Sequence, residues 1–194
     1  MIRLLGAGVV GGILMFVWGA LSHMVLGLGD MGMNSLPTPA EPAVVAALED
    51  ASLEPGLYFY PGWGEAHAKN FTKEQEAAWL KKYAAGPTGL ILYNKGTGEE
   101  VMMKPSQLAG EFASNVVAAL LVACIFAMAR MSLVTMVVSS IFIGLVVPAS
   151  ISFSHWNWYG FPTAWLTGEC LDQVVGWTIS GTGIALVLGN RRKV

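Results

Sequence analysis

Four long apolar stretches constrain the fold of this chain more than any other feature. They cover residues 4–28, 109–129, 131–153 and 171–189, and the first and third contain no Asp, Glu, Lys or Arg. A helix needs about 20 predominantly apolar residues to cross a hydrocarbon core about 30 Å thick. Each stretch therefore predicts a transmembrane helix, and we expect an α-helical integral membrane protein with a four-helix transmembrane bundle. Only Arg130 separates the second stretch from the third, so we expect these two helices to form an antiparallel hairpin.

The composition supports the same class of protein. Hydrophobic residues make up 54% of the 194 residues and charged residues only 12%, whereas a soluble domain carries about 25% charged residues. The net charge of −2 offers no broad basic surface for a nucleic-acid backbone. We therefore expect the lipid bilayer, and not nucleic acid, as the partner of most of the chain.

The basic residues predict the orientation of the chain. Arg3 precedes the first stretch, Arg130 separates the second from the third, and the tail 190–194 carries three more basic residues. In a chain with four spans these positions share one side of the membrane, and basic residues favour the cytoplasmic side. We expect both termini in the cytoplasm of a bacterium and the spans in its inner membrane. The sequon Asn70-Phe-Thr72 leaves open a eukaryotic secretory membrane, where it would be lumenal.

Residues 29–108, between the first span (1–28) and the second, differ in character from the rest. Six lysines, ten acidic residues and several prolines interrupt shorter apolar runs, which predicts a small α+β extracytoplasmic insert. Residues 41–51 favour a helix and 57–60 a strand. Thr72 and Gln75 have the spacing of a capping box at the start of a helix that extends to residue 85. Residues 89–93 and 100–104 flank a turn-rich segment and predict a β-hairpin.

Small residues recur at helical spacing within three of the apolar stretches. In lipid no hydrophobic force drives helices together, so small residues that allow close backbone approach favour packing. The contacts could lie within the bundle or with another membrane subunit. The predicted helix-packing residues are Gly8, Gly12, Gly19, Ala119, Ala123, Ala127, Gly176 and Ser180.

Polar and aromatic side chains gather near the predicted outer ends of the spans, where each polar group in hydrocarbon needs an explanation. We expect them to form a ligand-binding layer at one level of the membrane. An aromatic outer loop, predicted over residues 153–170 of the segment 109–189, would act as a lid or stacking surface. The candidate residues are His23, Glu111, Asn115, His155, Trp156, Trp158 and Asp172.

These residues leave several functions open. Two histidines with carboxylates suit a transition metal, and two imidazoles can ligate haem iron, but no H-x-x-x-H or C-x-x-C spacing indicates a cofactor. The absence of a catalytic pattern favours a non-enzymatic accessory, assembly or scaffolding subunit that docks to other membrane subunits or to copies of itself. The alternatives are a redox or metal protein that uses His23 and His155, and a membrane-interface enzyme or carrier for lipid or isoprenoid-type ligands, with Glu111 or His155 as acid–base group.

Overall fold

The computed structural model describes residues 1–64, 71–96 and 103–189. The chain divides into two compact units, one made of residues 1–34 and 101–194 and the other of residues 35–100. The described residues are mostly helical, at 69%, and include one small two-stranded sheet. The predicted basic tail 190–194 lies outside the described residues.

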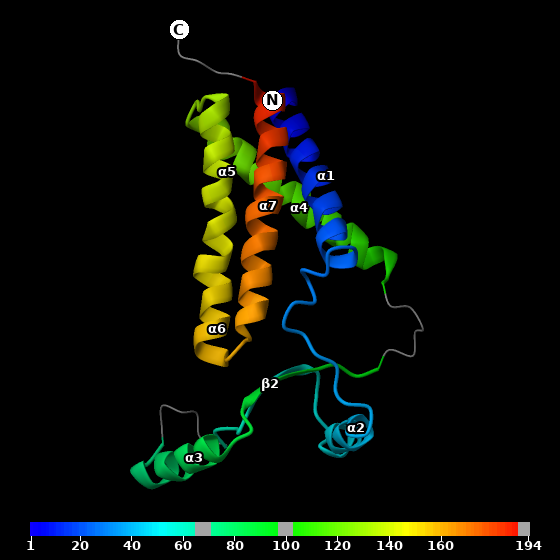
Figure 1. The fold of residues 1–194 in the computed structure, drawn as a ribbon, viewed down its shortest axis with the longest axis vertical. Helices are drawn as coiled ribbons and strands as arrows, with labels where there is room; N and C mark the ends of the chain where they lie inside the picture. The colour runs from blue at the N-terminus through cyan, green and yellow to red at the C-terminus, as the bar shows by residue number, and fades with distance from the viewer. Residues whose placement is uncertain (65–70, 97–102, 190–194) are drawn as a thin grey trace. The chain divides into compact units, whose positions relative to one another are not determined.

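Among its described residues, the first unit contains four helices long and apolar enough to cross a membrane, as the sequence predicts. Membrane insertion itself stays a prediction. The third of these is continuous from Leu133 to Tyr159 but is built from three successive elements (Figure 1). The elements of this unit are α1 (Ile2–Met24), α4 (Pro105–Met128), α5 (Leu133–Val147), η2 (Pro148–Ser152), α6 (Phe153–Tyr159) and α7 (Thr163–Leu188).

Pro148 explains the π-helical turn η2 inside the third long helix. Proline has no N–H, and its ring clashes with the carbonyl of the preceding α-helical turn. A π-turn is wider, and here the N–H of Phe153 bonds to the carbonyl of Pro148 five residues earlier. The helix thus continues beyond residue 153, where the apolar stretch was expected to end. It stops at Gly160, whose φ of 71° is a left-handed conformation that favours glycine.

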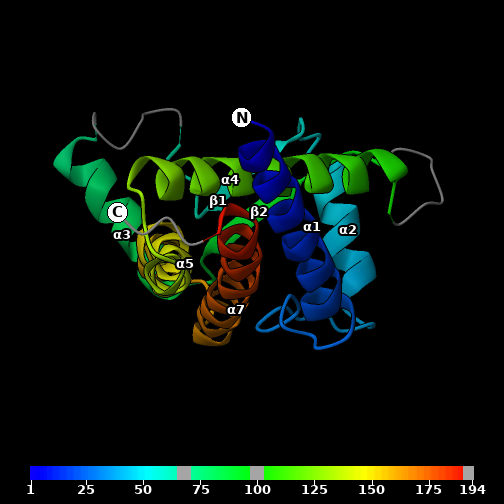
Figure 2. The same ribbon diagram turned by 90° about the horizontal axis from the view of Figure 1, so that it is seen from above.

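The helices pack in an order that the sequence did not predict. α1 packs against both α4 and α7, and α5 packs against α7. We expected the helices on either side of Arg130 to form an antiparallel hairpin. They are joined by a short turn, in which Arg130 has a φ of 48°, but α4 lies crosswise to the other helices (Figure 2). α4 therefore diverges from α5 at this turn and crosses α1.

Glycine and alanine residues form the contact between α1 and α4. A Cβ added at Gly12 would lie 2.6 Å from the Cα of Val116, and one at Gly8 would overlap the side chain of Leu120. Ala119 and Ala123 of α4 are completely buried, and Ala127 is half-buried. The backbones of these two helices can approach each other closely only because these side chains are small.

The contact between α1 and α7 uses small residues as well. The fully buried Ser180 hydroxyl donates a hydrogen bond of 2.9 Å to the carbonyl of Gly11. A Cβ at Gly176 would lie 2.7 Å from the indole ring of Trp18. Gly19, which was expected to pack in the same way, differs because no atom lies within 4 Å of the position of its missing Cβ. It faces open space and not a neighbouring helix.

The second unit contains α2 (Glu41–Asp50), α3 (Lys73–Ala85) and two antiparallel strands, β1 (Gly56–Tyr60) and β2 (Gly89–Tyr93), with Gly56 opposite Tyr93. Among the described residues, 89–93 pair with β1, and both strands carry the apolar and aromatic side chains that favour cross-strand contacts. The expected pairing of 89–93 with 100–104 stays a prediction. Most of segment 100–104 lies outside the described residues.

The capping box at the start of α3 is confirmed. The Thr72 hydroxyl accepts the Gln75 N–H at 3.3 Å, and the Gln75 side chain accepts the Thr72 N–H at 3.0 Å. The pKa of the exposed Glu74 carboxyl is lowered by a hydrogen bond from its own backbone N–H and by one from the Thr72 side chain. The ionised carboxylate therefore stabilises the helix start at neutral pH, and this contribution is lost as the pH falls through the lowered pKa.

The contrast between Gly12 and Gly19 gives a test of the helix packing. Gly12→Ala should lower the stability of the protein by about 1–3 kcal/mol because the new methyl group meets the backbone of α4. Gly19→Ala, on the same helix, should leave stability unchanged or raise it by about 0.5–1 kcal/mol. Thermal unfolding in detergent micelles, followed by circular dichroism, measures both. Equal effects of the two substitutions would contradict the packing described here.

Candidate functional site

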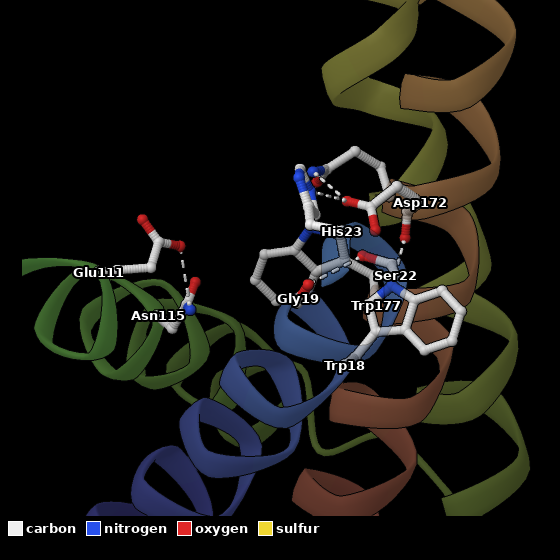
Figure 3. A network of polar contacts seen from close by, with 9 residues as sticks. Trp18, Gly19, Ser22, His23, Glu111, Asn115, Asp172 and Trp177 are labelled. Atoms are coloured by element: carbon white, nitrogen blue, oxygen red, sulfur yellow. Dashed lines mark hydrogen bonds and ion pairs between the residues drawn. The ribbon is translucent and has the colours of Figure 1, made fainter. Parts of the chain in front are cut away.

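Polar side chains from the last turns of α1 meet polar side chains of α7 (Figure 3). His23 belongs to the last turn of α1, and its Nε2 lies 4.0 Å from Oδ2 of Asp172. The side chain of Asp172 is only 15% exposed, whereas that of His23 is 53% exposed. The indole N–H of Trp18 donates a hydrogen bond of 3.1 Å to the backbone carbonyl of Asp172. These contacts join the two central helices at their polar ends.

Asp172 has one oxygen that the described residues leave unsatisfied. Its Oδ2 accepts from the Gln173 amide at 3.5 Å, while Oδ1 is buried and receives no hydrogen bond within the described parts of the chain. The Gln173 amide oxygen in turn accepts the indole N–H of Trp177 at 3.2 Å. Glu169 lies within electrostatic range of His23, Asp172 and His155. The polar end of α7 is therefore acidic and only partly hydrogen-bonded.

Asp172 lies inside α7 and not at its start. The sequence placed residues 153–170 in an aromatic outer loop, which is wrong for most of the segment: it forms α6 and the first turns of α7, and only Gly160–Pro162 connect them. Thr167 illustrates why polar residues are tolerated there, since its hydroxyl donates to the carbonyl of Thr163 at 2.9 Å. The hydropathy pattern does not include this part of the helix because it counts such residues as polar and takes no account of the local hydrogen bonds that satisfy them.

A second polar pair lies on α4. Asn115 donates a hydrogen bond of 3.2 Å to Oε1 of Glu111, one turn earlier, and Figure 3 shows this pair apart from the contact between His23 and Asp172. Both residues line a cavity of about 340 Å³ between α1 and the start of α4. His23, which lies beside Asp172, also lines this cavity together with Glu111. The lining residues are Phe16, Gly19, Ala20, His23, Met24, Met103, Leu108, Glu111 and Asn115.

His155 lies among aromatic rings. Its ring stacks on Phe161 with centroids 5.2 Å apart and lies 5.9 Å from Trp165 and 6.0 Å from Tyr159. The candidate aromatic residues take other roles: the Trp156 indole donates to the Thr163 hydroxyl at 3.2 Å, and Trp158 is 75% exposed. The rings that surround His155 were therefore not the two tryptophans singled out in the sequence.

The structure thus joins four candidate residues in two pairs, His23 with Asp172 and Glu111 with Asn115, and His155, Trp156 and Trp158 belong to neither pair. Among the described residues, no three His, Cys, Asp or Glu side chains are close enough together to hold a metal ion. Sequence reasoning did not include Glu169 and Trp177 in the layer. Their spacing could have indicated them, since Glu169 lies three residues before Asp172 and Trp177 four residues after Gln173, on the same helix face.

No family model matches this chain, and neither a curated protein nor a solved structure matches it.

The Trp18 hydrogen bond can be tested with a matched pair of substitutions. Trp18→Phe should destabilise the protein by about 0.5–1.5 kcal/mol, because it removes the N–H that bonds to the Asp172 carbonyl. Trp158→Phe, at a site 75% exposed, should have no measurable effect. Unfolding in a fixed detergent, followed by intrinsic fluorescence, compares the two variants, and an unchanged Trp18→Phe variant would show that this contact does not hold α1 to α7.

Proposed function

We propose that this chain is a multi-pass accessory, assembly or scaffolding subunit of a bacterial inner membrane, and that its insert binds an extracytoplasmic partner. The observation that carries the proposal is that no described residue of the unit 35–100 is buried. Its sheet has only two strands, and such a sheet is marginally stable without further packing. A partner surface packed against this unit would bury side chains that the unit itself does not bury.

An aromatic cluster indicates where that partner binds. Phe59 stacks on Trp63 at 5.2 Å, and Trp79 stacks on Tyr83 at 5.1 Å. The Trp79 indole donates to the carbonyl of Pro61 at 3.0 Å, which fixes its ring, while Trp63 and Tyr83 remain 41% and 43% exposed. Rigid, exposed aromatic side chains are enriched among the residues that dominate protein interfaces. This cluster is therefore the favoured docking surface of the insert.

The arrangement of the helices supports the proposed orientation. The start of α1, the turn between α4 and α5 and the end of α7 lie at the same end of the first unit (Figure 1). Arg3 and Arg130 belong to that end, which matches a cytoplasmic location for basic residues. The insert is connected to the opposite end, so it would be extracytoplasmic. The small residues of α1 already contact α4 and α7, which favours the insert over α1 as the surface for partners.

Purification from the native membrane in a mild detergent tests the docking surface. Native mass spectrometry should find the chain of 20.6 kDa bound to a second polypeptide, either a different protein or another copy. Tyr83→Ala should raise the dissociation constant about 30-fold or more, since truncation of a dominant interface aromatic costs about 2 kcal/mol or more. Leu92→Ala, an exposed apolar site at 73% outside the cluster, is the control. Recovery of the wild type as a monomer in several mild detergents would contradict the proposal.

A further inference from the structure

The cavity between α1 and α4 combines apolar walls with hydrogen-bond acceptors. Its volume of about 340 Å³ lies within the range of small-ligand pockets, which are mostly apolar with a few polar groups that orient the ligand. Phe16, Met24 and Leu108 contribute apolar surface, and Glu111 and Asn115 contribute oxygen atoms. The missing side chain of Gly19 leaves open space on the α1 wall.

The charge in this cavity is negative. Glu111 is the one acidic residue in its lining, and no Lys or Arg is among the described residues that line it. Asp172 lies 4.0 Å from the imidazole of His23, and Glu169 is also in electrostatic range of His23. Lys104, at the start of α4, already has an interaction of its own. A carboxylate within a membrane span is costly unless a partner compensates its charge, so the complementary ligand presents a cationic group to the cavity.

We propose that the cavity binds an aminolipid of the surrounding bilayer, with its primary ammonium group at Glu111. An ammonium group has three donors and no acceptor. Glu111, the Asn115 carbonyl oxygen and the His23 imidazole can accept from it, and only Oε1 of Glu111 accepts the hydrogen bond from Asn115. The upper part of one acyl chain lies against Phe16, Met24 and Leu108. The ligand is a lipid and not a soluble amine, because the cavity wall is apolar and belongs to two predicted spans.

Lipid selectivity of the full chain tests this site independently of any protein partner. The protein is placed in nanodiscs with equal amounts of phosphatidylethanolamine, phosphatidylcholine and phosphatidylglycerol of the same chain length, and native mass spectrometry counts the lipids retained. Phosphatidylethanolamine should be retained preferentially, since the choline headgroup cannot donate N–H hydrogen bonds and the glycerol lipid is anionic. Glu111→Gln should reduce this preference about tenfold, because a hydrogen bond to a charged group is lost.

Three further variants test the roles of the Glu111 charge and of the open space at Gly19. Glu111→Asp retains the charge and should retain the preference, and Glu76→Gln, which removes an exposed carboxylate of α3, should change nothing. Gly19→Leu should fill the open space and expel all three lipids while the unfolding temperature is preserved. Equal retention of the three lipids by the wild type, or an unchanged preference in Glu111→Gln, would overturn the proposal. A polypeptide cross-linked into the cavity with no lipid retained would also overturn it.

Discussion

The close approach of α1 to α4 and α7 is the interaction on which the rest of the first unit depends. In the proposed membrane location, lipid tails are as apolar as leucine side chains, so burial of apolar surface would not drive these helices together. The contacts come instead from glycine at positions 8 and 12 against α4, and from the buried hydrogen bond between Ser180 and the Gly11 carbonyl on the α7 side. α1 is thereby fixed between two helices that make fewer contacts with each other.

The same packing positions the polar groups. Because α1 lies along α7, Trp18 reaches the Asp172 carbonyl over Gly176 and His23 lies beside the Asp172 carboxylate. Because α4 crosses α1, the two helices are in close contact at Gly12 but leave a cavity at Gly19. Gly19, about two turns after Gly12 on the same helix, therefore lines a pocket, whereas Gly12 packs against α4. The proposed lipid site results from the crossing of these helices.

Much of this fold follows from the sequence, for identifiable reasons. The long helices follow from the length of the apolar stretches, and the start of α3 follows from Thr72 and Gln75. The start of α7 does not, since Thr163, Thr167 and Glu169 lower the hydropathy of residues 163–170, whereas in the helix the Thr167 hydroxyl bonds to the Thr163 carbonyl. The pairing of β1 with β2 depends on contacts between distant segments, which local turn patterns do not specify.

The candidate site shows the same division. Glu111 and Asn115 are four residues apart on one helix, so their hydrogen bond follows from helical periodicity. That His23 lies beside Asp172, while His155 lies among Phe161, Trp165 and Tyr159, depends on how the helices pack. The sequence groups these residues at one level of the membrane but does not say which of them touch. The separation of the layer into pairs, and the cavity beside one of them, required the structure.

The central claim, that four helices cross the membrane with the polar layer at the outer end, is tested most directly by cysteine accessibility. In a chain with Cys124 and Cys170 replaced by Ala, single cysteines are introduced as Ser35→Cys, Ala129→Cys and Asn157→Cys, all at exposed positions. A membrane-impermeant maleimide added to cells with a permeable outer membrane should label positions 35 and 157. Position 129 should react only after the inner membrane is opened. The account would be contradicted if position 129 were labelled in intact cells, whether position 157 was labelled as well or stayed unlabelled.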